Sequence, residues 1–163
     1  WLLDVIVLSF FYVIRILSGG IINDIDISLW LISFSTFFFL FLATIKRLGE
    51  LINYSEKEDS IEGRSYNIRQ LKTLKYLSSI FSISSITLLS FYFLSEKVHT
   101  LYNNIYLLFF ICPVMLYWQF HIYTKTIKKF MLDDPIIFIT KDTLSWFVLI
   151  FSISIIISQM KIW

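Results

Sequence analysis

The chain has 163 residues, of which 57% are hydrophobic and 16% are charged, with a formal net charge of +2 at pH 7. Soluble domains have about 45–50% apolar and about 25% charged residues, so this composition excludes an ordinary soluble domain. The net charge is too small to indicate a nucleic-acid partner. Cys112 is the single cysteine, so no intrachain disulfide can form, and we expect a small buried residue there.

Apolar runs divide the chain into five predicted helices. A membrane-spanning helix needs about 20 mostly apolar residues, with about 17 as a lower limit. Four runs reach this length without a charged residue, and a fifth does so apart from Asp4 and Arg15. These runs lack the alternation of barrel strands, so an all-α, multi-pass transmembrane bundle in one membrane domain is predicted. The expected helices cover residues 1–18, 29–51, 68–95, 105–131 and 142–160.

The first predicted helix ends at Gly19–Gly20, because paired glycines are a natural helix stop. Its two charges, Asp4 and Arg15, lie on nearly the same face, about three turns apart. Charges within a span are costly and normally face a cavity or other helices, so this polar stripe predicts one of these roles. We expect Ser28 to cap the second helix, and residues 23–26 to form a solvated loop rather than a metal motif.

The second predicted helix ends in the charged sequence Lys46-Arg47-x-x-Glu50. One interpretation is an ion pair between Lys46 and Glu50, which are one turn apart. The other is a phosphate clamp, with lysine as a point charge, arginine as a two-pronged donor and glutamate orienting them or helping to hold a cation. A polar stretch, residues 53–67, follows and is long enough to cover a site, and Asn67 is the predicted cap of the third helix.

Pro113 is expected to kink the fourth helix, and His121, without a second histidine or cysteine at ligand spacing, is expected to be structural. The next loop gathers several charged residues. Two interpretations stay open: a turn with a helix cap at Asp142, or a Mg²⁺ site in which one or two carboxylates join phosphates and water. The charged residues of this loop are Asp133, Asp134, Lys141 and Asp142.

The distribution of basic residues predicts the topology. Outside the apolar runs, the successive loops and the tail contain 0, 7, 1, 4 and 1 Lys or Arg residues. Cytoplasmic loops carry an excess of Lys and Arg, so the loops after the second and fourth helices are expected in the cytoplasm and the C-terminus outside. The protein is therefore expected to be a multi-pass cell-membrane protein surrounded by lipid.

The order of these motifs resembles the second half of the UbiA superfamily of intramembrane prenyltransferases. Within it, the chain is most similar to the branch with polyprenyl-phosphate phosphoribosyltransferases and with prenyltransferase domains fused to a HAD-type phosphatase. The resemblance runs almost end to end, and the similar stretches are Asp4-Val5 through Arg15 to Gly19, the KRxxEL-like residues 46–51, residues 63–66, residues 112–118, residues 133–138 and Asp142.

This resemblance implies that the five helices are the C-terminal part of a nine-helix fold. The missing N-terminal helices would carry an NDxxDxxxD motif, so the chain, which opens inside a helix without a methionine, is expected to be a fragment that is inactive alone. The implied activity is Mg²⁺-dependent prenyl transfer from a polyprenyl pyrophosphate to an acceptor. The alternatives are phosphoribosyl transfer to a polyprenyl phosphate, and a membrane protein without enzymatic activity, such as a scaffold or transporter part.

The resemblance and the charge pattern together assign the site residues by role. Those expected to act on the pyrophosphate are Lys46, Arg47 and Glu50. Those expected to bind substrate phosphate are Arg64, Tyr66, Arg15 and Lys141, with Arg64 and Tyr66 closing a lid. Those expected to hold the metal are Asp133, Asp134 and Asp142.

Overall fold

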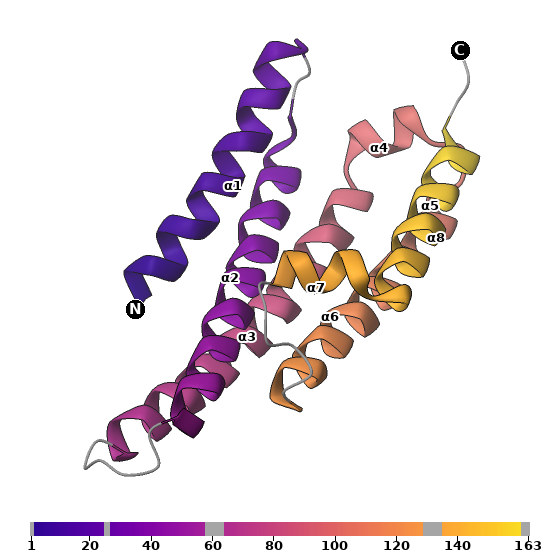
Figure 1. Ribbon diagram of the computed structural model, residues 1–163. Coiled ribbons are helices and arrows are strands. Elements are labelled where there is room, and N and C mark those ends of the chain that lie inside the picture. Colours follow the sequence, from indigo (N-terminus) through magenta and orange to yellow (C-terminus); the bar gives the residue numbers. More distant parts are fainter. Residues whose placement is uncertain (1, 25–26, 58–63, 129–134, 161–163) are drawn as a thin grey trace.

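The computed structural model describes the chain except at residues 1, 25–26, 58–63, 129–134 and 161–163 (Figure 1). Regular structure in the described part is helical, and one isolated bridge joins Tyr102 to Met160. The helices are α1 (Leu2–Ile22), α2 (Leu29–Lys57), α3 (Arg64–Phe93), α4 (Glu96–Leu101), α5 (Ile105–Phe109), α6 (Ile111–Ile127), α7 (Pro135–Lys141) and α8 (Thr143–Gln159).

Four stretches of the described chain are long and apolar enough to cross a membrane. They are Leu3–Ile22, Leu29–Ile52, Gln70–Phe93 and Ile105–Ile127. The last helix, α8, is apolar but has 17 residues, which corresponds to about 26 Å against a hydrocarbon core of about 30 Å. The predicted all-helical membrane bundle is confirmed, with four candidate spans and a shorter fifth helix where five spans were expected.

The end of α1 corrects the predicted stop at Gly19–Gly20. The helix continues through both glycines to Ile22, and the chain leaves it at Asp24, whose φ of 51° is left-handed. Asn and Asp tolerate this conformation better than most residues, and Asn23 also donates from Nδ2 to the Gly19 carbonyl at 2.7 Å. The polar loop residues therefore end the helix. The predicted cap at Ser28 is confirmed, because its Oγ accepts from the Leu31 amide at 3.2 Å.

Helices α2 and α3 form the most extensive contact of the bundle and extend side by side (Figure 1). Small residues are buried along both helices, which lets the two backbones approach closely. The buried small residues are Ser35, Ala43 and Thr44 on α2, and Ser78 and Ser85 on α3. The predicted cap of α3 at Asn67 is wrong, because the helix begins at Arg64 and Asn67 lies within it. Residues 64–67 contain no helix breaker, and each has a propensity within about 0.7 kcal/mol of alanine.

Pro113 interrupts the fourth predicted helix, as expected. The break between α5 and α6 lies at Phe110, one turn before the proline, because Pro113 has no amide to donate to the Phe109 carbonyl. Helix α6 ends at Ile127, four residues before the predicted end at 131. Two short helices, α4 and α7, were not predicted, since six or seven residues are too few to show a clear helical period.

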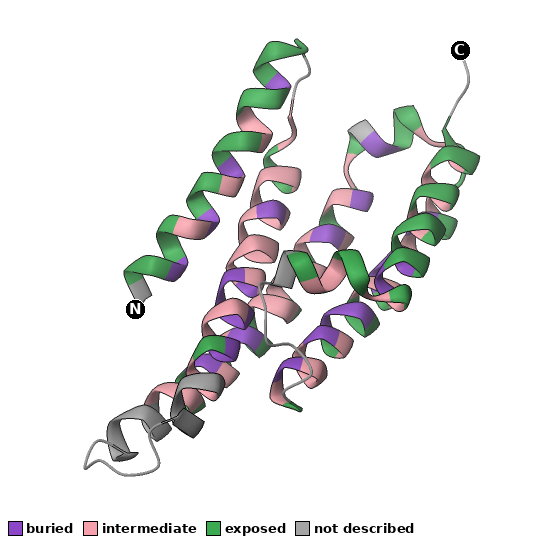
Figure 2. Cartoon of the chain, viewed as in Figure 1, coloured by how far each residue is buried: buried purple, intermediate pink, exposed green. Residues whose placement is uncertain are grey.

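Helix α7 folds back against the bundle. Its residues Phe138 and Ile139 pack on a core cluster formed by α2, α6 and α8 (Figure 1). The carboxyl ends of α2 and α6 and the start of α3 lie together at one end, which we call the basic end. Its described basic residues are Lys46, Arg47, Lys72, Lys75, Lys125 and Lys128. In Figure 2 the outer faces of α1 and α8 are largely exposed, as expected for helices that face lipid or further protein.

Candidate functional site

The charged sequence of α2 forms an ion pair at the basic end. The Arg47 guanidinium donates to Oε2 of Glu50 at 2.8 Å, and the two side chains are 34% and 47% exposed. A pair this accessible adds about 0–1 kcal/mol to stability. Glu50 thus pairs with Arg47, whereas the sequence had suggested Lys46, a half-buried side chain on the same turn.

Arg47 has donor capacity beyond this pair. Its Nε is buried and has no hydrogen-bond acceptor among the described residues. A guanidinium carries five donors in a fixed fork, and a buried donor without an acceptor is unfavourable by about 1–3 kcal/mol. The Arg47 side chain as a whole is 34% exposed, so an oxyanion can approach its outer part, and a shift of the side chain that opens Nε would let the oxyanion satisfy this donor as well.

A second polar cluster joins α6 to the start of α8. Asp142 is the N-cap of α8, and its Oδ2 accepts from the amide of Ser145 at 2.9 Å and from the hydroxyl at 2.8 Å. Its Oδ1 lies 3.3 Å from Nε2 of His121, and the indole Nε1 of Trp118 donates to Ser145 at 2.9 Å. Four side chains therefore hold the α6–α8 junction.

The environment of Asp142 favours its ionised form. Burial raises the pKa of this carboxyl, but the hydrogen bonds from Ser145 and the neighbouring His121 outweigh burial and lower the pKa below its usual value. The cap predicted from the sequence is confirmed, because Asp142 accepts from the Ser145 amide. Both carboxylate oxygens already have partners, so the observed contacts do not favour metal binding by Asp142, which stays a prediction.

The two clusters are linked through the core. Ile45 of α2 and Trp118 and Ile122 of α6 belong to one buried cluster. Lys46 follows Ile45 directly, and His121 precedes Ile122. The charged sequence of α2 and the α6–α8 junction therefore both adjoin this apolar cluster.

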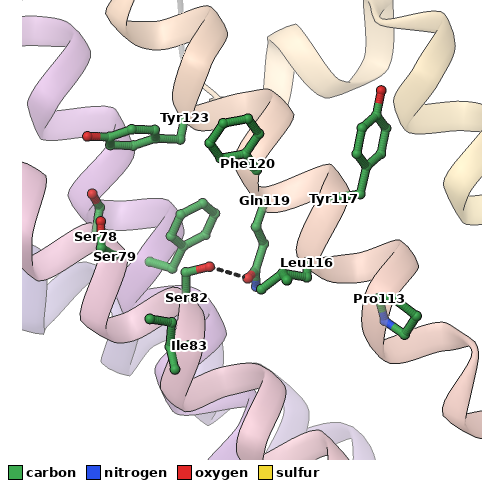
Figure 3. A pocket seen from close by; sticks show the side chains of 11 residues that line it. Ser78, Ser79, Ser82, Ile83, Pro113, Leu116, Tyr117, Gln119, Phe120 and Tyr123 are labelled. Atoms are coloured by element: carbon green, nitrogen blue, oxygen red, sulfur yellow. Dashed lines mark hydrogen bonds between the residues drawn. The ribbon is translucent and has the colours of Figure 1, made fainter.

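An apolar groove of about 520 Å³ lies between α3 and α6 (Figure 3). Its floor carries a buried hydrogen-bond network: Ser82 donates to Oε1 of Gln119 at 2.6 Å, and Nε2 of Gln119 donates to Ser85 at 2.9 Å. A second apolar groove of about 750 Å³ follows α6 and α8, and Pro113 and Tyr117 line both grooves. The volumes and lining suit hydrocarbon chains.

The structure does not bring Arg15 to the α2 ion pair. Tyr12 stacks on Phe39 at 4.9 Å, which fixes the alignment of α1 and α2. Arg15 is three residues beyond Tyr12 in one direction, and Lys46 is seven residues beyond Phe39 in the other. The two are therefore separated by about 15 Å along the helix axes.

The other predicted site residues fall in different places. Arg64 and Tyr66 lie in the first turn of α3, a helix rather than the predicted lid loop, and their side chains are outside the described part. Lys141 is the exposed last residue of α7, directly before Asp142. Asp133 and Asp134 lie outside the described residues. Among the described residues, no three His, Cys, Asp or Glu side chains gather closely enough to hold a metal ion.

Sequence reasoning missed the groups that the tertiary fold assembles. Gln119 is fully buried in the α3–α6 network, and Trp118 and Ser145 complete the junction around Asp142. The single glutamine in this mostly apolar span was a usable signal, because a polar side chain at that depth needs a partner. The contact of His121 with Asp142 has no signal in the sequence, since 21 positions separate them.

The chain is 35% identical over 149 residues to the uncharacterized protein y4nM of Sinorhizobium fredii (strain NBRC 101917 / NGR234). The alignment covers 90% of this chain and 29% of that relative, so the chain spans less than a third of the relative's length. No protein-family model matches the chain, and no solved structure matches it.

Proposed function

We propose that the chain is the C-terminal part of an intramembrane transferase of the UbiA type, which transfers a prenyl group from a polyprenyl pyrophosphate to an acceptor at the cytoplasmic membrane face. The observation that carries the proposal is the buried Nε of Arg47, which has no acceptor in the described part, beside the Arg47–Glu50 pair. The motif order in the sequence adds support. The greater length of the matched relative leaves room for the missing helices.

The basic end faces the cytoplasm in this proposal. The described lysines and arginines of α2, α3 and α6 gather there, and basic residues are retained on the cytoplasmic side. The pyrophosphate of a polyprenyl substrate lies at the same boundary, because its hydrocarbon tail stays in the membrane. In this proposal Arg47 and Lys46 bind the charged head group, and the apolar grooves beside α6 accommodate the tail.

Lys46 and Arg47 bind the pyrophosphate, and Glu50 holds the Arg47 guanidinium in position. The half-exposed Glu50 carboxylate is suited to coordinate Mg²⁺, either directly or through a water molecule. Mg²⁺ usually takes one or two carboxylates together with phosphates and water. When bound, Mg²⁺ supplies further positive charge against the leaving pyrophosphate. Asp142 fits this role poorly, because Ser145 and His121 occupy its oxygens.

The reaction follows from this arrangement. As the bond between the prenyl carbon and the pyrophosphate oxygen breaks, negative charge grows on the leaving group, where Lys46 and Arg47 stabilise it. The acceptor then forms a bond to the resulting allylic cation, and the proton that it loses passes to the released pyrophosphate. Apolar walls keep water away from the cation, and the rings of Phe41, Phe120 and Tyr123 in the α3–α6 groove offer aromatic faces to it.

A transfer assay tests the proposal. Membranes that contain the complete polypeptide are incubated with labelled prenyl pyrophosphate, with either Mg²⁺ or a chelator. Parallel reactions supply labelled phosphoribosyl pyrophosphate with a polyprenyl phosphate. We expect Mg²⁺-dependent transfer of the prenyl label, and we expect the 163-residue chain alone to be inactive.

The variants Arg47→Ala and Glu50→Ala should lower turnover at least about tenfold, the effect of losing about 1.4 kcal/mol of transition-state binding. Lys72→Ala and Glu96→Ala are matched controls, because both side chains are exposed charges on other helices. If only the ribosyl label is transferred, the activity is phosphoribosyl transfer to a polyprenyl phosphate and not prenyl transfer. Lack of both activities would favour a membrane protein without enzymatic activity, in which these charges only set the topology.

A further inference from the structure

Helix α1 is packed on one side only. In the described chain its extensive contact is with α2, and it lies at the edge of the bundle (Figure 1). The buried positions follow a single face, and Tyr12 on that face stacks on Phe39. The buried residues of α1 are Val5, Ser9, Val13 and Gly20.

The rest of α1 divides into two flanks of different chemistry, one on each side of the buried face. The division follows from the helical rotation of about 100° per residue. The flank that we call the lipid flank consists of Leu3, Ile6, Val7, Phe10, Ile14, Leu17 and Ile21. The flank that we call the charged flank consists of Asp4, Leu8, Phe11, Arg15, Ser18, Gly19 and Ile22.

All polar and small residues of α1 outside the buried face lie on the charged flank. Asp4 and Arg15 are both exposed, and their separation of about 16 Å along the axis prevents them from pairing with each other. A charge that faces lipid within a span is unfavourable, so the charged flank is poorly suited to lipid. The lipid flank is wholly apolar and has no such penalty. A Cβ added at Gly19 would meet no atom within 4 Å, so the small pair Ser18–Gly19 leaves open room for a close neighbour.

We infer that the charged flank of α1 is a docking surface for one further transmembrane helix that runs antiparallel to α1. That helix carries a basic side chain level with Asp4 and an acidic side chain level with Arg15. Along its own direction the acidic residue therefore comes first, and the basic residue follows about eleven positions later. Such a helix neutralises both charges at once.

A second copy of this chain does not fit the surface. Two copies in one membrane share their topology, so a two-fold axis along the membrane normal makes their α1 helices parallel. Asp4 would then face Asp4, and Arg15 would face Arg15, which is repulsive. An antiparallel helix has the opposite topology, as successive spans of one polypeptide have. The inference rests on the placement of α1 in the membrane and is independent of the transferase chemistry.

Disulfide crosslinking to designed test helices examines this inference. The chain, with Cys112→Ala and Ser18→Cys, is co-expressed in a bacterial inner membrane with a leucine-rich single span. A cytoplasmic lysine cluster at the carboxyl end of the test helix fixes it antiparallel to α1. Three test helices are compared: acidic residue first with a basic residue eleven positions later, the reverse order, and no charge. Each has a cysteine level with Ser18.

We expect the acid-first helix to crosslink about fivefold more than the other two. Leu17→Cys, on the lipid flank at the same depth, should not distinguish the three helices. The double variant Asp4→Lys with Arg15→Asp should reverse the preference toward the base-first helix. A disulfide between Tyr12→Cys and Phe39→Cys, tested in the same membranes, reports whether α1 still packs on α2.

Equal crosslinking of all three test helices to Ser18→Cys, with the Tyr12–Phe39 disulfide formed, overturns the inference. The same holds if Leu17→Cys crosslinks as selectively as Ser18→Cys, because the two flanks would then be equivalent. If α1 of the charge-exchanged variant does not pack on α2, that variant is set aside. The crosslinking of the three test helices to the chain with native Asp4 and Arg15 then decides whether the inference holds.

Discussion

The buried network around Gln119 allows a defined test of how α3 and α6 are held together. Gln119 is fully buried and makes a hydrogen bond to Ser82 at 2.6 Å (Figure 3) and another to Ser85 at 2.9 Å. Gln119→Leu keeps a similar volume but removes both bonds. Hydrogen bonds between membrane helices contribute about 0.6 kcal/mol on average and about 1.7 kcal/mol at most. We therefore expect a loss of about 1–3 kcal/mol in the free energy of unfolding.

The loss should fall nearer the lower value, because Ser82 can turn its hydroxyl toward a carbonyl of its own helix. The measurement is unfolding in mixed detergent micelles, followed by circular dichroism. Gln159→Leu is the matched control, since the Gln159 side chain is partly exposed and, among the described residues, its amide donates to the adjacent Ser158 rather than to another helix. If Gln119→Leu is as stable as Gln159→Leu, the network does not stabilise the contact of α3 with α6.

Further predictions concern the α6–α8 junction and the topology. Asp142→Ala should destabilise the protein by about 0.5–2 kcal/mol through loss of the α8 cap. Because the pKa of Asp142 is lower in the folded protein, its contribution is present at neutral pH and lost as pH falls below about 4, so wild type and Asp142→Asn should converge in stability at acid pH. Trp118→Phe should lower the free energy of unfolding by about 0.5–1.5 kcal/mol, because the bond to Ser145 is lost and the ring remains. Lys128→Cys should react with a membrane-impermeant thiol reagent only after the cells are permeabilised, because its loop is cytoplasmic in the proposed topology. Glu96→Cys should react with the same reagent in intact cells. The opposite pattern would reverse the proposed topology.

Much of the fold followed from the sequence because the apolar runs are long. Their lengths predicted the main helices, and local chemistry predicted the caps at Ser28 and Asp142 and the break before Pro113. The short helices α4 and α7 could not be predicted from the sequence. Helix α7 owes its position to the packing of Phe138 and Ile139 on distant helices, which no local pattern reveals.

The candidate site followed from the sequence less completely. The spacing predicted an ion pair in α2, but Arg47 rather than Lys46 contacts Glu50. The junction of His121 with Asp142 depends on how α6 meets α8, a tertiary contact. Arg15 was grouped with the phosphate ligands by resemblance, yet the antiparallel alignment of α1 and α2 places it near the opposite end.

Binding of a polyprenyl thiopyrophosphate, an analogue whose bond to the leaving group resists cleavage, tests the role of Arg47 most directly. Equilibrium binding is measured with Mg²⁺ on membranes that contain the complete polypeptide. A charge-assisted hydrogen bond contributes about 1.5–3 kcal/mol, so Arg47→Ala should weaken binding by about 10- to 100-fold. Arg47→Lys should give an intermediate loss, and Lys72→Ala should bind as wild type does. Equal affinity of Arg47→Ala and wild type for the analogue would contradict the proposed pyrophosphate site at the end of α2.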